Sequence, residues 1–350
     1  MIKGNAHGLG TVAIASALIQ NCGCNVIACA QVTEAIAVRE GGFSETTIML
    51  LSGVPFHALR YVVDHRLLMP VYEEESIRRL SREVSAQGME SFDVQLKIDT
   101  GLHRIGVVPE DLDRILDVIK EVGNLRVVGV LTHYANCYVK DDPFTLKQYD
   151  AFERAVARIR QRGFAPYYIH AGCSGSVMWM KDLVSTHVRV GWGYIAFTPL
   201  KSIPQYFDCH PAISLRAYIT AIYRVRQGET IGYGCNCRAE RPMVTATVSL
   251  GYADGFPRMA AMNHAPVLLH GRRCRCLSIC MDQTFVDVTE VDCRIGDEIT
   301  FFGRDLYSEE CLSTAEIASY ADDNPTGLHV ALAPRVKRVY LFGENREKCT

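Results

Sequence analysis

Short apolar runs alternate with amphipathic stretches over about the first 200 residues of the chain. The runs lie at residues 25–30, 46–51, 67–72, 92–99, 125–133, 167–173 and 186–191. They are almost continuously hydrophobic, which is typical of parallel strands that are buried on both faces. Between them lie stretches with apolar residues at helical spacing. Residues 109–123 and 143–163 are the clearest, and each ends in a glycine that can stop a helix.

Residues 1–3 read as the end of one further strand, so the pattern contains eight strand–helix units. Eight such units favour a (β/α)8 barrel over an open sheet. In such barrels the chemistry lies where strands end and loops begin. The predicted strand ends are all polar or ionisable, which fits a site better than packing: Lys3, Asp99, His133, His170 and Arg189.

The pattern changes near residue 210, after which strand-like segments are separated by glycine-containing turns. These segments lie at residues 213–225, 243–252, 265–271, 283–289 and 297–303. One helix is predicted over residues 313–321, because Ser313 and Glu316 have the spacing of a capping box. We therefore predict an α/β (β/α)8 barrel over residues 1–210, followed by a mostly β domain over residues 211–350.

Composition narrows the functional classes. The formal charge of -2 gives no support for a nucleic-acid or membrane-surface partner, since both favour a basic face. No apolar run reaches the roughly 18 residues that span a bilayer, and no signal peptide is recognisable, so we expect a cytoplasmic protein. The 14 cysteines show no paired C-x-x-C spacing, so we expect reduced thiols and no metal site.

Lys3 is a candidate catalytic residue only when it is considered together with other segments of the chain. A strand-end lysine can serve as a Schiff-base amine, although a lone lysine near a terminus is more often only solvated. Further along the chain come "LKIDTGLHRIG", "LTHYA", "HAGCSGS", "VRVGWG", "GYADGFPR" and "CMDQ". Together with "IKGNAHGLG", these segments resemble the ordered motifs of the alanine racemase family. The resemblance covers nearly the whole chain, and "GYADGFPR" with "CMDQ" is its most specific part.

The resemblance implies a pyridoxal 5'-phosphate enzyme that interconverts L- and D-alanine. Racemisation needs two acid–base groups on opposite faces of the α-carbon. By resemblance, Lys3 would carry the cofactor and act as one base, and Tyr252 would act as the other. His133 matches the partner of this tyrosine, which would have to lower the phenol pKa from about 10. Arg104 matches an arginine near the phenolic oxygen and the substrate carboxylate.

The same resemblance assigns cofactor contacts. Arg189 matches the residue that bonds the pyridine nitrogen, and because arginine keeps its proton the ring nitrogen would stay unprotonated. His170 would orient this arginine. The phosphate contacts would come from the backbone and hydroxyl groups of Ser174, Gly191 and Trp192. Lys97 matches a lysine that is often carbamylated in the family.

Three replacements depart from the family pattern. His7 stands where the family has a phosphate-binding tyrosine, and Cys173 replaces an asparagine, so we expect weaker phosphate binding. Thr326 replaces a tyrosine that crowds the substrate methyl group. The smaller hydroxyl residue leaves space and a polar contact, so serine is an alternative substrate.

The substrate site is expected to be shared between subunits. Met281 and Asp282 match a wall of this site that, like Tyr252, would come from a second subunit. The resemblance therefore implies an obligatory homodimer. It also implies a role in supplying D-alanine for cell-wall synthesis.

Other interpretations stay open on the sequence alone. Family members carry a longer segment before the lysine, so we expect either a start placed too late or a poorly held Lys3 backbone. The departures also allow a catalytically inactive homologue that binds the cofactor. A decarboxylase of the same architecture fits "GYADG" and "CMDQ" less well.

Overall fold

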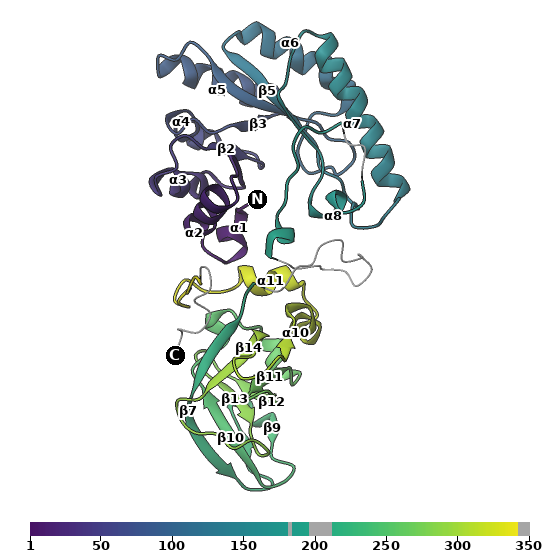
Figure 1. The fold of residues 1–350 in the computed structure, drawn as a ribbon. Coiled ribbons are helices and arrows are strands. Elements are labelled where there is room, and N and C mark those ends of the chain that lie inside the picture. Colours follow the sequence, from purple (N-terminus) through teal and green to yellow (C-terminus); the bar gives the residue numbers. More distant parts are fainter. Residues whose placement is uncertain (181–183, 196–211, 342–350) are drawn as a thin grey trace. The chain divides into compact units, whose positions relative to one another are not determined.

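A computed structural model describes residues 1–180, 184–195 and 212–341, and the described chain divides into two compact units (Figure 1). The first unit holds residues 1–6 and 10–194, and the second holds residues 7–9, 195 and 212–341. The predicted domain boundary at residue 210 lies outside the described residues.

The described part of the first unit is built around six parallel strands: β1 (Val26–Cys29), β2 (Thr47–Leu50), β3 (Met69–Val71), β4 (Phe92–Lys97), β5 (Leu125–Leu131) and β6 (Tyr168–His170). β1 pairs with β2, and β3 to β6 form a second sheet in sequence order. A bridge between Met49 and Leu68 joins the two sheets. All six were predicted from their apolar runs.

Main-chain hydrogen bonds close this ring of strands. The Ile2 nitrogen donates to the Ala28 carbonyl oxygen over 2.8 Å, which places residues 1–2 beside β1. The Met1 nitrogen donates to the Val190 carbonyl oxygen over 2.8 Å. At the other end, the Thr186 nitrogen donates to Ile169 of β6 over 2.8 Å. Residues 1–2 and 186–190 thus take the places of the first and last strands, and the predicted barrel is confirmed.

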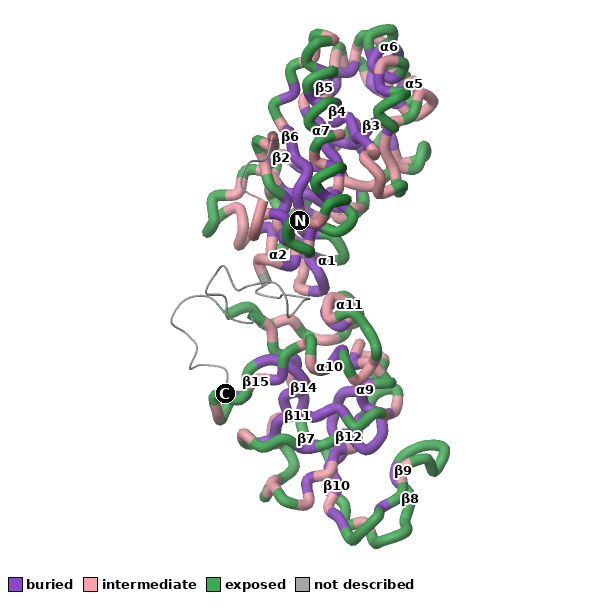
Figure 2. The backbone as a smooth tube through the Cα atoms, turned by 90° about the vertical axis from the view of Figure 1, so that its right-hand side faces the viewer, coloured by how far each residue is buried: buried purple, intermediate pink, exposed green. Residues whose placement is uncertain are grey.

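Helices follow the strands along the chain: α2 (Thr11–Ser16), α3 (Val32–Glu40), α4 (Leu59–Asp64), α5 (Glu74–Ala86), α6 (Leu112–Val122), α7 (Pro143–Gln161) and α8 (Ser174–Val177). α6 and α7 confirm the two predicted helices. Ile115 and Ile119 on one face of α6 are buried, and Gly123 ends the helix at a φ of 74°. Figure 2 shows buried residues concentrated on the strands and exposed ones on the outer helix faces.

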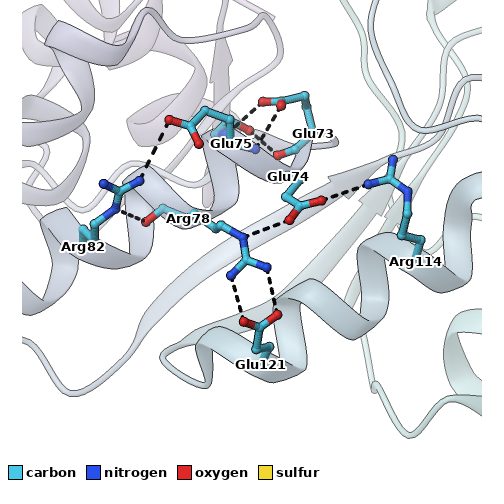
Figure 3. Close-up of polar contacts among 8 residues, drawn as sticks. Glu73, Glu74, Glu75, Arg78, Arg82, Arg114 and Glu121 are labelled. Carbon is cyan, nitrogen blue, oxygen red and sulfur yellow. Dashed lines mark hydrogen bonds and ion pairs between the residues drawn. The ribbon is translucent and has the colours of Figure 1, made fainter.

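Surface ion pairs connect neighbouring helices (Figure 3). Arg78 of α5 lies 2.8 Å from Glu121 of α6 and 3.0 Å from Glu74 of its own helix. Glu74 also receives Arg114 of α6 at 3.1 Å. These charges are largely solvated, so the ion pairs add little to the stability of the fold.

The second unit is built on one antiparallel sheet of β7 (Leu215–Val225), β10 (Met243–Val248), β11 (Pro266–Leu269), β12 (Arg272–Ile279), β13 (Thr284–Asp287), β14 (Glu298–Arg304) and β15 (Cys311–Leu312). The order is β11-β12-β13-β10-β7-β14-β15, and an additional β11–β14 pairing curls the sheet around its core. The rings of Phe256 and Phe301 meet in that core, 4.9 Å apart. The mostly β second domain is therefore confirmed.

The shorter elements of the second unit lie around this sheet. β8 (Thr230–Ile231) and β9 (Cys237–Arg238) form a short two-stranded sheet. The described helices of the second unit include α9 (Arg258–Met262), α10 (Thr314–Ala321) and α11 (Pro325–Val330). α10 confirms the predicted helix, since the Ser313 hydroxyl accepts the Glu316 N–H over 3.0 Å. Among the described helices, none has the length and apolar character needed to cross a membrane.

Candidate active site

Lys3 stands at the end of the first strand and starts a tight left-handed turn, α1 (Lys3–His7). Gly4, Asn5, Ala6 and His7 have φ values of 62°, 54°, 52° and 56°. Such a conformation costs a non-glycine residue about 1 kcal/mol or more, so the surrounding structure has to impose it. The turn changes the direction of the main chain immediately after Lys3 and leaves that side chain exposed.

Glu34 of α3 holds this turn. Its Oε1 accepts the N–H groups of Gly4 at 2.6 Å and Asn5 at 3.3 Å. Its Oε2 accepts those of Ala30 and Gln31 at 3.0 and 3.1 Å. With Ile2 paired to β1, the main chain is bonded on both sides of Lys3, contrary to the expectation of a poorly held backbone.

Arg189 is buried at the centre of a hydrogen-bond network. Its Nη1 donates to Nδ1 and to the carbonyl oxygen of His170, over 2.7 and 2.8 Å. Its Nη2 donates to the carbonyl oxygens of Thr132 and Ala171 and to Nδ1 of His133, over 2.8, 2.7 and 3.1 Å. Burial lowers the pKa of Arg189 to about 10, so it remains a cation at neutral pH. Within the described residues its Nε has no such bond and can donate to a bound group.

Gln95 fixes the proton position on His170. The Gln95 amide nitrogen donates to the carbonyl oxygens of Leu50 and Leu68, over 2.6 and 3.0 Å. Its Oε1 must therefore accept from Nε2 of His170, 3.1 Å away. Arginine can only donate, so Nδ1 of His170 carries no proton. Burial, with Arg189 nearby, holds the pKa of His170 well below its usual range, so the ring is neutral.

His133 and Lys97 lie near the same cation. Burial first, and Arg189 second, lowers the pKa of His133 to about 3. Because Arg189 donates to Nδ1 of His133, the proton of this neutral ring lies on Nε2, from which it can be donated. Burial, Arg189 and Arg104 lower the pKa of the Lys97 amine to about 7. Arg104 itself is exposed, on the loop after β4.

Hydrogen bonds of Ser174 connect the loop after β6 to the segment that follows residues 186–190. Its Oγ accepts the N–H groups of Gly191 and Gly193 over 3.0 and 3.2 Å. A Cβ on Gly193 would lie 3.2 Å from that oxygen, so the close approach favours glycine. Trp192 is buried, and its indole N–H donates to Tyr138 over 3.3 Å. Ser174, Gly191 and Trp192, three of the residues predicted to contact the phosphate, are thus adjacent in space.

In the second unit, the "GYADG" turn packs directly on the "CMDQ" loop. The N–H of Tyr252 donates to Cys280, and that of Ala253 donates to Met281, over 3.1 and 2.9 Å. A Cβ on Gly251 would lie 2.2 Å from the Met281 carbonyl oxygen, so only glycine fits there. Tyr252 and Met281 are 40% and 54% exposed.

Arg335 forms ion pairs with both of these segments. It lies 2.7 Å from Asp254 of the turn and 2.7 Å from the exposed Asp282. Thr326 lies half-buried in the first turn of α11, and its N–H donates to Asn324. His7 is buried and ends the left-handed turn.

Sequence reasoning missed several residues of these networks. Glu34 and Gln95 touch the segments that carry Lys3 and His170. A glutamine inside the apolar run of β4 was the available signal for Gln95, since a buried amide needs partners. A second exposed tyrosine, Tyr233, is 80% exposed in a turn between Gly232 and Gly234. Its signal was this glycine-flanked "GYG".

The predicted site residues are divided between the two units. The first unit contains Lys3, Lys97, Arg104, His133, His170, Ser174, Arg189, Gly191 and Trp192. The second unit contains Tyr252, Met281, Asp282 and Thr326. Among the described residues, no cluster of histidine, cysteine or acidic side chains could hold a metal ion.

The chain is similar to known proteins over nearly its whole length. The family "Alanine racemase, N-terminal domain" matches residues 1–199, and "Alanine racemase, C-terminal domain" matches residues 212–340. An alanine racemase of Symbiobacterium thermophilum is 30% identical, covering 97% of this chain and 89% of the relative. An enzyme named alanine racemase 2 from Caldanaerobacter subterraneus subsp. tengcongensis is 28% identical, with 98% and 87% covered.

A solved structure has the same fold. The alanine racemase of D-cycloserine-producing Streptomyces lavendulae superimposes with a TM-score of 0.90 at 29% identity. The match covers 98% of this chain and 90% of that one.

Proposed function

Because the chain belongs to the alanine racemase family, whose members are pyridoxal-phosphate isomerases, we propose that it interconverts L- and D-alanine by two-base proton transfer. The observation that carries this proposal is the Arg189 network, because a buried cation is held there by five acceptors while its Nε is left to donate.

The residues of the first unit fit the cofactor. Lys3 supplies an exposed amine for covalent attachment, and Nε of Arg189 supplies a donor for the pyridine nitrogen. The Ser174 hydroxyl already accepts two N–H groups, so its own hydrogen is left for a phosphate oxygen. Pyridoxal phosphate, when bound, delocalises the electron pair that remains when an amino acid loses its α-proton.

Lys3 would exchange the proton on one face of the α-carbon. Its backbone is fixed by Glu34 and by pairing of Ile2 with β1, which limits the positions that its amine can reach. A base in a defined place contributes about 10²–10⁴-fold to proton transfer. Arg104 would hold the substrate carboxylate, and its planar fork suits two oxygens.

The other face needs a phenol, and two tyrosines of the second unit qualify. The sequence resemblance favours Tyr252, and its contact with the Met281 loop supports it. Exposure favours Tyr233, which projects from its own unit on a glycine turn. Either phenol would become a better base where Nε2–H of His133 donates to its oxygen, because that bond stabilises the phenolate.

We also propose a homodimer with shared active sites. Tyr252, Met281 and Tyr233 are large and exposed side chains, and residues of this kind are usual at subunit contacts. Met281 and Asp282 would form the substrate wall of the neighbouring subunit. The physiological setting that follows is supply of D-alanine for the cell wall in the cytoplasm.

Serine is the alternative substrate. Thr326 is smaller than the family tyrosine that it replaces, so it would leave space for the serine side chain and offer it a hydroxyl group. Chiral separation of products from L-alanine and L-serine, with cofactor-loaded protein, tests both substrates. We expect D-alanine from wild type and none from Lys3→Ala. An absorbance band of bound cofactor without a D-product would instead identify an inactive cofactor-binding homologue. Release of carbon dioxide would identify a decarboxylase.

A further inference from the structure

Two thiols meet beside the predicted phosphate-binding serine. Sγ of Cys137, on the segment after β5, lies 2.9 Å from Sγ of Cys173, in the turn between β6 and α8. Cys137 is buried and Cys173 is partly exposed. Both are free thiols, and the proposed racemisation uses neither of them.

The surrounding structure holds the two sulfurs together. The indole N–H of Trp179 donates to the Cys137 carbonyl oxygen over 2.8 Å. The Ser176 hydroxyl accepts the Cys173 N–H over 2.9 Å. Between them, a Cβ on Gly175 would lie 2.8 Å from the Tyr138 ring and 3.0 Å from the Cys137 carbonyl oxygen. The two loops are therefore in close contact, and the sulfurs have little freedom to separate.

The environment makes the two thiols chemically different. The Cys137 thiol and the N–H groups of Gly175 and Ser176 stabilise negative charge on Cys173, which lowers the pKa of Cys173 despite its burial. The pKa of Cys137 is raised, because its proton is shared with Cys173 and because it is buried. A thiolate is the reactive form of cysteine, so Cys173 is the nucleophile of the pair and Cys137 the proton-carrying partner.

We propose that Cys137 and Cys173 form an oxidation site at which hydrogen peroxide converts two thiols into a disulfide. The Cys173 thiolate attacks one peroxide oxygen, the O–O bond breaks, and the departing hydroxide takes up a proton to leave as water. Cys173 is then a sulfenic acid. Cys137 loses its proton and attacks the Cys173 sulfur, the S–O bond breaks, and a second water leaves. One peroxide is reduced to two waters as the pair is oxidised.

A disulfide between Cys137 and Cys173 would lie next to the predicted phosphate-binding site. Cys173 directly precedes Ser174, whose hydroxyl is bonded to Gly191 and Gly193. A disulfide would join the segment after β5 covalently to the turn that carries Ser174. The covalent state of these two sulfur atoms does not depend on the proposed racemase activity.

Peptide mapping by mass spectrometry tests the proposal. The full-length reduced protein is treated with one equivalent of hydrogen peroxide, quenched with an alkylating reagent and digested without reductant. We expect the peptides of Cys137 and Cys173 to be linked to each other and to separate after reduction. Cys235→Ser, which removes an exposed thiol of the second unit, should leave this linkage unchanged.

A rate measurement adds a readout that does not depend on digestion. Cys137→Ala removes the donor to Cys173, so alkylation of Cys173 by iodoacetamide at mildly acidic pH should become about tenfold slower. Cys137→Ser keeps a donor, should react faster than Cys137→Ala, and also cannot form the linkage. The proposal is overturned if peroxide oxidises Cys22 or Cys235 while Cys137 and Cys173 stay unlinked. It also fails if Cys137→Ala leaves the alkylation rate of Cys173 unchanged.

Discussion

Arg189 donates to Nδ1 of His170 over 2.7 Å, while Gln95 accepts from Nε2 of the same ring over 3.1 Å. The imidazole is thus held between a group that can only donate and an oxygen that can only accept. One arrangement of hydrogens satisfies all three residues. A neutral His170 keeps Arg189 in place without adding a second positive charge to the buried site.

His170 should therefore not titrate in the physiological range. Burial and the charge of Arg189 keep its pKa well below the usual 6.5, so the folded ring stays neutral on Nδ1 down to acidic pH. Nitrogen-15 NMR of labelled histidines, read between pH 5 and 8, should show one unchanging Nε2–H tautomer for this residue. A midpoint within that range would contradict the assignment.

Replacement of Gln95 tests whether this side chain fixes the tautomer of His170 or only fills space in the core. Gln95→Met removes the donor to the Leu50 carbonyl oxygen and the acceptor of the His170 Nε2–H, whereas the Leu68 carbonyl oxygen keeps the Leu50 N–H. The free energy of unfolding should therefore fall by about 2 kcal/mol. Gln148→Met is the matched control, because Gln148 is equally buried and accepts the Ala135 N–H but does not touch His170. Both variants should lose stability, and only Gln95→Met should change the His170 NMR signal.

Tyr252→Phe and Tyr233→Phe decide which phenol transfers protons. Loss of the transferring hydroxyl should lower kcat by about 10²–10⁴-fold with the cofactor still bound. The other tyrosine should tolerate the change with an effect of about tenfold or less. Equal and small effects of both substitutions would show that neither phenol is the second base.

Lys97 should make stability depend on pH above neutrality. Its folded pKa of about 7 lies below the ordinary value of 10.5, so between these values the unfolded chain binds an additional proton. Stability should therefore rise with pH from about 7 to about 10, by an amount on the order of a few kcal/mol. Denaturant titrations at several pH values should show this rise in wild type and a flatter profile in Lys97→Met.

The same lowered pKa favours carbamylation of Lys97. A neutral amine can attack carbon dioxide, and the resulting carbamate anion would compensate the nearby charges of Arg189 and Arg104. Carbon-13 NMR after addition of labelled bicarbonate should show a carbamate signal in wild type and none in Lys97→Met. Bicarbonate should also remove the rise of stability with pH, and no change on its addition would show an unmodified lysine.

Thr326 should influence the choice between alanine and serine. Thr326→Tyr fills the space that the threonine leaves and should reduce kcat/KM for serine relative to alanine by about 10-fold or more. Thr326→Ser is the conservative control, since it keeps the hydroxyl and the space. A ratio that is the same in all three proteins would show that Thr326 does not set the substrate.

The sequence predicts the barrel well because its strands are continuous apolar runs and α6 and α7 have strong periodicity. Residues 1–2 and 186–190 do not form regular strands, and a few main-chain hydrogen bonds close the ring there. β12 was missed because three arginines interrupt the run Arg272–Ile279, although Cys274 and Cys276 point into the core.

The candidate site is less predictable than the fold. Arg189 and His170 were predicted because they lie in the short segments "VRVGWG" and "HAGCSGS", which resemble family motifs. The groups that orient them lie far away in the chain: Gln95 is 75 residues from His170. The Cys137–Cys173 contact spans 36 residues and follows no sequence pattern. Contacts of this kind form because the fold brings distant segments of the chain together, so they cannot be predicted from local sequence.

The central claim of two-base racemisation is tested most directly by turnover of L-alanine in deuterium oxide with the cofactor-loaded protein. Two separate bases remove one hydrogen and deliver another, so the first D-alanine formed should carry deuterium at its α-carbon. D-alanine that retains the original hydrogen in early turnover would show return by a single base and contradict the account, as would a cofactor-loaded protein that exchanges no α-hydrogen.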